Sequence, residues 1–276
     1  MKIRVFVKVT ITLLSNSCNF RAIVRSNSVN KVKAVAICLS LACALTVPAH
    51  ATTTIVSNTN DSGPGSLRQA LAISHDGDTI DGTGVSGVIT LTSGQLLVEK
   101  SVTINGSGAD VLAVDGNATS SVFQIGTGAT APTVAISGLT IRNAQGNFGG
   151  GIFISNAPTA TIINCTVSGS RAGFGGGIFS DAALLTIANT TISGNIASEG
   201  GGIYNNGTLT ITNSTFSGNS AQSVGGAMFN DKGTMRVTNS TMSNKFCLQR
   251  RWHPEPRYIG DRQHNPEDGR IWRQYP

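Results

Sequence analysis

The sequence predicts an all-β protein built as a parallel β-helix, a solenoid of stacked coils. Three observations favour this fold. The tetrapeptide GGGI, or GGAM in its last occurrence, recurs at steps of 25 or 26 residues, at Gly149, Gly175, Gly200 and Gly225. Each occurrence precedes a short stretch in which apolar residues alternate with Ser and Thr. The segments between are rich in Gly and Asn, and this composition is typical of strands joined by turns and not of helices.

Residues 1–51 are predicted to be an export signal peptide with a long preamble. They carry seven Lys and Arg and no acidic residue, and they contain the apolar run AVAICLSLACALTV at 34–47. This run is too short to span a membrane comfortably. The small-x-small pattern at Ala49, His50 and Ala51 predicts cleavage before Thr52. We therefore expect the protein to be exported to the cell surface, the outer membrane or the extracellular medium.

Residues 52–84 are predicted to cap the N-terminal end of the solenoid. The segment TTIVSN reads as a strand and leads into a Gly-Pro-Gly turn. Ser66 followed three residues later by Gln69 is the signature of a capping box, which predicts a short helix. A solenoid needs its open ends covered, so this strand and helix are expected to close the first coil.

Residues 85–243 are predicted to form coils of about 25 residues. When the repeats are aligned, three apolar columns emerge: Ala160, Leu185, Leu209 and Met235; Ile162, Ile187, Ile211 and Val237; and Val167, Ile192, Phe216 and Met242. Ile136 and Ile141 extend the last two columns backwards. A single coil cannot bury its apolar column, whereas stacked coils do, at a spacing of about 4.8 Å.

Two further columns have structural roles in this scheme. Asparagine recurs at the end of each long strand, at Asn164, Asn189, Asn213 and Asn239. Stacked asparagines can form an amide ladder, which we expect here. The first glycines of the repeats, at Gly149, Gly175, Gly200 and Gly225, are expected to form a tight corner that needs positive φ or a close backbone approach.

Residues 244–276 break the pattern and are predicted to be a disordered tail translated out of frame. A further GGGI is due near residue 250, where the sequence reads RRWHPEP. Trp252 is encoded only by TGG and the codon of His253 begins with C, so reading one base ahead gives a glycine codon. The truncation of a longer repeat by a frameshift is the favoured interpretation. A genuine disordered basic tail and a nucleic-acid-binding patch are the alternatives.

Charge and cysteine content narrow the function classes. The net charge of +6 comes from the two ends, because residues 52–243 carry six basic and ten acidic residues. A mildly acidic body argues against a nucleic-acid partner. Cys165 is the only cysteine between residues 52 and 243. We expect it to be a buried small residue, not a reactive thiol.

The cap sequence DSGPGSLRQAL, followed by repeats such as GGGIYNNGTLTITNSTFSGN, resembles bacterial exported β-helix proteins of the pectate-lyase-like superfamily. It is similar in particular to those that share GG[AG]I and FxxN repeats with chlamydial polymorphic outer-membrane proteins. The second motif is FSGN at 216–219. The resemblance covers about 53–243 and implies a right-handed helix. It also implies surface display or secretion, with outer-membrane association through a C-terminal anchor that is missing here.

Candidate chemistry in the repeats is sparse. Asp181 and Asp231 fall in one column two coils apart, so their backbones should be about 10 Å apart, which resembles the carboxylate pair of an inverting glycosidase. Ordinary turn residues are the favoured interpretation. Asp76, Asp78 and Asp81 could bind Ca²⁺ through their oxygens, but a polar loop near the cap is the favoured interpretation. We therefore expect no catalytic residue and no cofactor, with these two sets as weak alternatives.

Two functions remain. The favoured one is a non-catalytic surface or secreted rod, similar to an adhesin or an autotransporter passenger, whose partners are glycans or surface proteins. The alternative is a polysaccharide lyase or glycoside hydrolase of the pectate-lyase-like superfamily. A broken gene whose product has no function is compatible with either.

Overall fold

The structure is a computed structural model that describes residues 9–12, 17–20, 51–127, 131–155, 158–247 and 258–260. The chain divides into two units, Met1–His50 and Ala51–Pro276. In the first unit, β1 (Val9–Thr12) and β2 (Ser17–Phe20) pair as antiparallel strands. The rest of the predicted signal peptide, and the predicted out-of-frame tail apart from its first residues and 258–260, lie outside the described residues.

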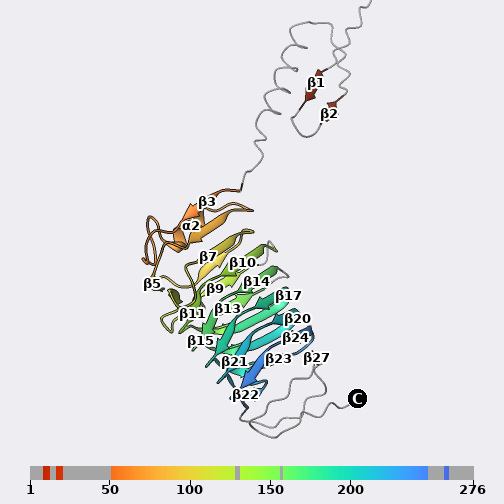
Figure 1. Ribbon diagram of the computed structural model, residues 1–276. Helices are drawn as coiled ribbons and strands as arrows, with labels where there is room; N and C mark the ends of the chain where they lie inside the picture. The colour runs from red at the N-terminus through yellow and green to blue at the C-terminus, as the bar shows by residue number, and fades with distance from the viewer. Residues whose placement is uncertain are drawn as a thin grey trace, which may run out of the picture. The chain divides into compact units, whose positions relative to one another are not determined.

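The second unit is a parallel β-solenoid, in which the described strands form three sheets (Figure 1). The largest sheet contains β3 (Thr53–Ile55), β4 (Thr79–Gly82), β6 (Leu96–Val98), β7 (Thr103–Gly106), β9 (Phe123–Ile125), β10 (Thr133–Ser137), β13 (Ile152–Ile154), β14 (Thr159–Ile163), β17 (Ile178–Ala188), β20 (Ile203–Thr212), β23 (Met228–Asn230), β24 (Thr234–Thr238) and β27 (Tyr258–Gly260). The second sheet contains β5 (Gly87–Thr90), β8 (Leu112–Asp115), β11 (Thr140–Arg142), β15 (Thr166–Ser168), β18 (Thr191–Ser193), β21 (Thr215–Ser217) and β25 (Thr241–Ser243). The third contains β12 (Gln145–Phe148), β16 (Arg171–Phe174), β19 (Ile196–Glu199), β22 (Ser220–Val224) and β26 (Phe246–Cys247).

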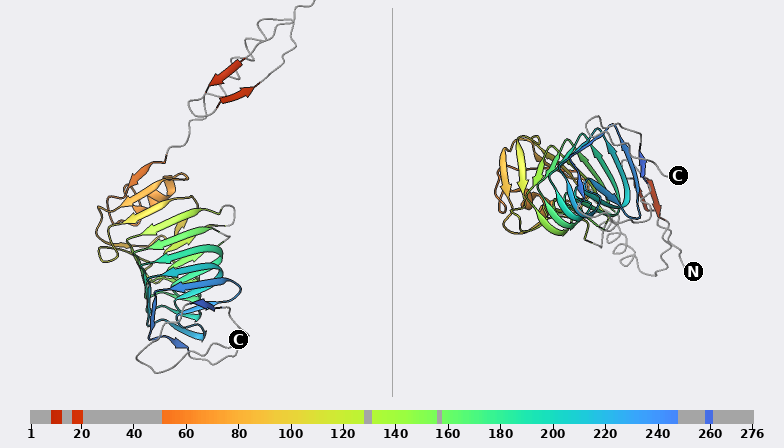
Figure 2. Two further views of the ribbon diagram at one scale, coloured as in Figure 1. Left: turned by 45° about the vertical axis from the view of Figure 1, so that its right-hand side comes forward. Right: turned by 90° about the horizontal axis from the view of Figure 1, so that it is seen from below.

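The register of the strands confirms the predicted apolar columns. Ile162 lies opposite Ile187, and Ile187 lies opposite Ile211. The same holds for the other two columns, and all their members are buried except Met242, which is partly buried against the core. Figure 2 shows the strands of successive coils lying side by side along the second unit. Equivalent apolar residues thus form one continuous core along the stack.

Each repeat turns at three corners where one residue adopts positive φ. At the first corner this residue is Asn164, Asn189, Asn213 or Asn239, with φ between 48° and 53°. At the second corner it is Gly169, Gly194 or Gly218, with φ of 62° or 63°. At the third corner it is Gly149, Gly175, Gly200 or Gly225, with φ between 53° and 68°. Only Gly, and less often Asn, visits this region at low cost, which explains their periodic recurrence.

Close backbone stacking explains why two more small residues follow at the third corner. A Cβ on Gly176 would lie 2.4 Å from the carbonyl oxygen of Gly201. A Cβ on Gly177 would lie 2.7 Å from the carbonyl oxygen of Gly202. The glycines of successive coils therefore lie directly against one another, and there is no space for a side chain between them.

An amide ladder was predicted at the first corner, whereas the buried amide-to-amide bonds among the described residues lie at the second corner and in the largest sheet, where Asn205 Nδ2 donates to Asn230 Oδ1 at 2.6 Å. In the first column, one amide-to-amide bond is present among the described residues, from Asn189 Nδ2 to Asn164 Oδ1 at 3.2 Å, and it is exposed. At the second corner, Asn195 and Asn219 are buried, and Asn195 Nδ2 donates to Asn219 Oδ1 at 3.1 Å. The residue after the positive-φ position points inward, so the ladder lies one position beyond a corner.

The single described helix, α2 (Leu67–Ile73), covers the N-terminal end of the core, as predicted. Ser66 caps it, because its side chain accepts the N–H of Gln69. Leu67, Ala70 and Leu71 are buried. The helix therefore protects the apolar end of the first coil from water. No helix in the described part of the chain is both long and apolar enough to cross a membrane.

Candidate functional site

The two catalytic candidates predicted from the sequence lie along the largest sheet, with Asp181 in β17 and Asp231 directly after β23. Asp181 pairs in register with Asn206, and Asn206 Nδ2 donates to Asp181 Oδ1 at 2.9 Å. Asp231 lies one coil further, where its N–H donates to the carbonyl oxygen of Asn205 at 3.0 Å. Asp181 and Asp231 are thus two coil steps apart, about 10 Å between backbones, with an amide between them.

Tyr204 lies beside these carboxylates. Burial is the largest cause that raises the pKa of its phenol, and together with Asp231, which accepts a hydrogen bond from the phenol, and with Glu199 and Asp181 it brings the pKa to about 12. The phenol is therefore held protonated at neutral pH, as a hydrogen-bond donor and not as a base. This surface combines an aromatic ring, three carboxylates and an amide.

The carboxylates considered for Ca²⁺ each hold a different segment of the cap. Asp78 accepts the N–H groups of Thr52, at 2.7 Å, and His75, at 2.8 Å, through its two oxygens. These backbone hydrogen bonds lower the pKa of Asp78. Asp76 accepts the N–H of Ser101 at 2.7 Å.

The third member, Asp81, closes a local turn. Its Oδ1 accepts the N–H and the hydroxyl of Thr83, which lowers the pKa of Asp81. Within the ranges that the structure describes, no group of three or more His, Cys, Asp or Glu side chains is arranged to bind a metal ion.

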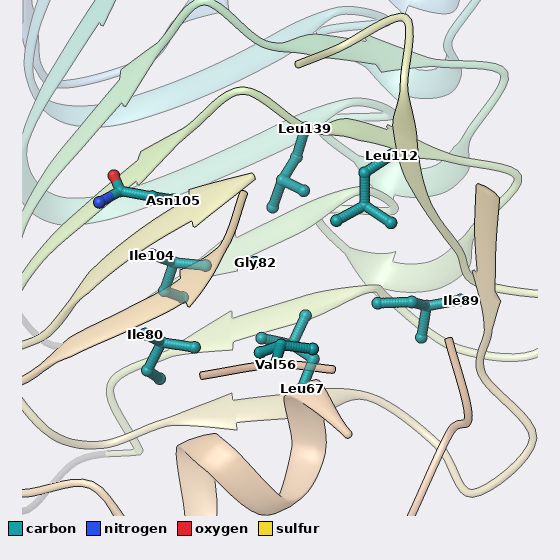
Figure 3. Close-up of a pocket in the computed structure, with 9 residues that line it drawn as sticks. All are labelled: Val56, Leu67, Ile80, Gly82, Ile89, Ile104, Asn105, Leu112 and Leu139. Atoms are coloured by element: carbon teal, nitrogen blue, oxygen red, sulfur yellow. The ribbon is translucent and has the colours of Figure 1, made fainter. Parts of the chain in front are cut away.

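A small apolar cavity lies beneath the capping helix. Its volume is about 10 Å³, and the residues that line it are drawn in Figure 3: Val56, Leu67, Ile80, Gly82, Ile89, Ile104, Asn105, Leu112 and Leu139. Its one amide side chain, that of Asn105, already accepts a hydrogen bond from Ser137 at 2.9 Å. A space of this size could hold at most one water molecule, and the lining leaves few polar partners for it.

An open polar groove of about 580 Å³ lies over the first corner. The loop 106–110 forms one wall, and Asn164, Thr166, Asn189 and Thr191 contribute to the other. Cys165 also borders it, but its side chain is buried and burial raises the pKa of the thiol to about 11. The prediction of a buried cysteine is confirmed, and the thiol is protonated at neutral pH and poorly nucleophilic.

Two sets of residues in the described coils were not predicted from the sequence. The first is the buried ladder of Asn195 and Asn219, whose signal is the Asn of the recurring phrase SGN. The second is a column of aromatic residues, whose signal is the residue after each glycine corner, as in GGGIF and GGGIY. Both signals recur in the repeat, but only the aromatic residues follow the alternation of the strands, because Asn195 and Asn219 each come directly after a positive-φ glycine.

Comparison with known proteins adds one match. A family model described as a right-handed beta helix region matches residues 79–248, more than half of the chain. No curated protein and no solved structure matches the chain.

Proposed function

The chain belongs to the right-handed β-helix family, and on this premise we propose that it is an exported, non-catalytic rod that acts through the contacts of its outer faces. The leader supports export, since basic residues, an apolar run of 14 residues and a small-x-small site follow one another before Thr52. The stacked coils supply a stiff scaffold with extended surfaces, which repeat proteins commonly use for binding.

The proposal that the protein is non-catalytic is supported by the hydrogen bonds that its carboxylates make to other protein groups. Asp181 is hydrogen-bonded to Asn206, and Asp78 holds two backbone N–H groups of the cap. Acid–base catalysis requires a carboxyl group placed to exchange a proton with a substrate. These two carboxylates instead join neighbouring coils or segments.

The exposed faces favour glycans or surface proteins as partners. The second sheet presents an outward column of Thr166, Thr191, Thr215 and Thr241 in register. Hydroxyl groups at regular spacing can donate to and accept from sugars or polar protein surfaces. This arrangement supports a function similar to that of an adhesin or an autotransporter passenger at the cell surface.

We also propose that a frameshift after about Ser243 interrupts the repeat array, because the sequence from there on no longer follows the repeat. The test is to resequence the gene segment that encodes Thr241 to Trp252. A miscounted base should restore GGGI-type repeats beyond residue 250. An unchanged reading frame, confirmed on independent template, would overturn this part of the proposal.

Export and catalysis are tested on the full chain. Expressed in a bacterial host, it should yield an exported product whose N-terminal sequence starts at Thr52. The purified product should release neither reducing ends nor unsaturated sugars from pectin or other polysaccharides. Release that disappears in the double variant Asp181→Asn, Asp231→Asn would instead establish the polysaccharide-degrading alternative.

A further inference from the structure

An aromatic column runs along the outer face of the largest sheet. Phe153, Phe179, Tyr204 and Phe229 occupy equivalent positions of β13, β17, β20 and β23. Each follows a residue of the GGGI or GGAM motif that points inward, so the ring points outward. The ring centroids of successive members are 5.7, 5.2 and 5.3 Å apart.

Two further rings join this column across the glycine corner. Phe148 lies 5.8 Å from Phe153, and Phe174 lies 5.6 Å from Phe148, between ring centroids. We call these six residues the aromatic strip: Phe148, Phe153, Phe174, Phe179, Tyr204 and Phe229. Phe148 is 42% exposed, and all the others except Phe179 are partly exposed.

None of the six rings belongs to the core cluster, although Phe179 is itself buried, so the packing of the solenoid interior does not explain their position. A contiguous apolar surface in contact with water is characteristic of a binding site. Within the described coils, the interior is filled by aliphatic residues and by Phe123 and Phe216. The rings of the strip therefore form a second apolar cluster outside the core, with four rings on the largest sheet and two, Phe148 and Phe174, on the third sheet across the corner.

Polar side chains border the aromatic strip along its length. Asp181, Asn206 and Asp231 each come two residues after a ring, so they lie on the same face of the strands. On the other side, Glu199 occupies the position that Phe174 has one coil earlier. The charged groups that act on the Tyr204 phenol are all acidic, namely Asp231, Glu199 and Asp181.

We infer that the aromatic strip and its acidic and amide border bind a neutral glycan chain that lies along the stack of coils. A sugar ring has an apolar C–H face and a rim of hydroxyl groups. The C–H face would lose contact with water against the rings, while hydroxyl groups donate to the carboxylates and exchange hydrogen bonds with Asn206. The column spans four coils, about 14 Å, which is enough for a short oligosaccharide.

The negative charge of the residues that border the aromatic strip determines which class of glycan can bind. Three carboxylates beside the strip repel a polyanion such as a chain of uronates, and they do not oppose a neutral chain. This inference rests on the proposed function, because it identifies which partner the rod contacts and where. It also separates this chain from enzymes that act on acidic pectate.

The experiment is native affinity electrophoresis of the purified full chain through gels that contain xylan, galactomannan, mixed-linkage β-glucan or polygalacturonate. We expect at least one of the neutral polysaccharides to retard the protein and polygalacturonate to leave its mobility unchanged. The variant Phe148→Ser should weaken the association about tenfold. The matched control is Val88→Ser, which removes an apolar side chain of similar exposure, 40%, from a strand of the second sheet and should bind as the wild type does.

A second variant keeps the inference testable if Phe148→Ser does not fold. Asp181→Ala leaves the rings in place and should still weaken binding severalfold, because it removes a hydrogen-bond acceptor for the sugar. The circular dichroism spectra of all variants should match that of the wild type. Absence of retardation by every neutral polysaccharide, equal weakening by Val88→Ser, or preferential binding of polygalacturonate would each overturn the inference.

Other outcomes separate this inference from the proposed function. A concentration-dependent dimer that Phe148→Ser abolishes would make the aromatic strip an interface between copies of this chain and overturn the glycan assignment. Failure of binding together with normal export would sink the inference alone. Hydrolysis or elimination of a bound polysaccharide would sink the non-catalytic function and leave the binding surface intact.

Discussion

Asn195 Oδ1 accepts the backbone N–H of Ser170, one coil earlier, at 3.0 Å. Asn219 in turn accepts the N–H of Asn195 at 3.0 Å. At the first corner the hydroxyl groups of Thr190, Ser214 and Ser240 accept the N–H of the equivalent residue one coil earlier. Each coil thus supplies the side chain that satisfies a corner amide of the coil before it.

The variant Asn195→Ala should destabilise the protein strongly. It leaves the N–H of Ser170 buried without its acceptor and removes the bond from Asn195 Nδ2 to the carbonyl of Val167 at 3.0 Å. Each unsatisfied buried group costs about 1–3 kcal/mol, so we expect a loss of about 3 kcal/mol in the free energy of unfolding, measured in urea. Thr215→Ala, at an exposed position of β21, is the control and should change stability by less than about 1 kcal/mol. Equal effects of the two changes would show that the ladder contributes nothing special.

Two glycines with the same φ should differ in their tolerance of alanine. Gly194 and Gly200 both have φ of 63°. A Cβ on Gly194 would make only an ordinary contact, with the backbone nitrogen of Gly169 at 3.9 Å, so Gly194→Ala should cost about 1–2 kcal/mol from backbone strain alone. A Cβ on Gly200 would lie 2.4 Å from the carbonyl oxygen of Ile203, so Gly200→Ala must also move the backbone.

Thermal unfolding of the two variants measures this difference. We expect Gly200→Ala to lower the melting temperature clearly more than Gly194→Ala does. A similar shift for both would mean that positive φ, and not the close approach of the chain, determines the need for glycine at the third corner.

The Asp61–Arg68 pair should make the stability of the cap sensitive to acid. Arg68 Nη2 donates to Asp61 Oδ1 at 2.6 Å, and Asp61 Oδ2 accepts the N–H of Ser93 at 2.8 Å. Burial raises the pKa of Asp61, but these hydrogen bonds outweigh it and hold the pKa well below its ordinary value of 3.8. Because the pKa of Asp61 is lower in the folded state than in the unfolded state, its ionised carboxylate stabilises the fold at pH values above the ordinary pKa of 3.8. This stabilisation is lost as the pH falls from 3.8 towards the folded-state pKa.

The variant Asp61→Asn tests this dependence. At pH 7 it should reduce the free energy of unfolding by about 2 kcal/mol, because a charged acceptor is lost. As the pH is lowered below about 4, the wild type should lose stability more steeply than the variant, and the melting temperatures of the two proteins should converge. Parallel pH profiles would contradict a lowered pKa at this site.

The high pKa of Tyr204 should be visible in an alkaline titration followed by ultraviolet absorbance. The chain has three tyrosines, and Tyr204 should ionise near pH 12, well after an exposed phenol. Since the folded-state pKa is raised, the associated stabilisation is complete below about pH 10 and is lost as the pH rises through 12. The variant Tyr204→Phe should remove the late step and keep the others; a late step that persists would belong to another tyrosine.

The columns and the cap were predictable because they follow simple periods. Ile162, Ile187 and Ile211 recur at one spacing, and alternation alone places them inside. Ser66 and Gln69 identify the helix start by a local hydrogen-bond pattern. The Asn195 ladder was missed because a positive-φ residue interrupts the alternation, so the inward-facing position after it cannot be found by counting in twos.

The candidate site was less predictable than the fold. The sequence places Asp181 and Asp231 in one column, but it does not indicate that Asn206 and Tyr204 engage them. The aromatic residues after each glycine corner alternate correctly with the inward Ile residues. The contact between Phe148 and Phe153 across the corner depends on how sharply the backbone turns at Gly149. The spacing of the repeats does not indicate the angle of this turn.

The hydrogen bonds to the corner amides imply an order in which the coils of the solenoid are completed. Because Asn195 completes the coil of Ser170, a chain that emerges from its N-terminus finishes each coil only after the next one has been laid on it. Folding would then advance behind the growing chain with a lag of one coil, starting from the end that α2 covers. At any moment the newest coil would be the one most open to proteases and to hydrogen exchange, and the oldest would already be sealed.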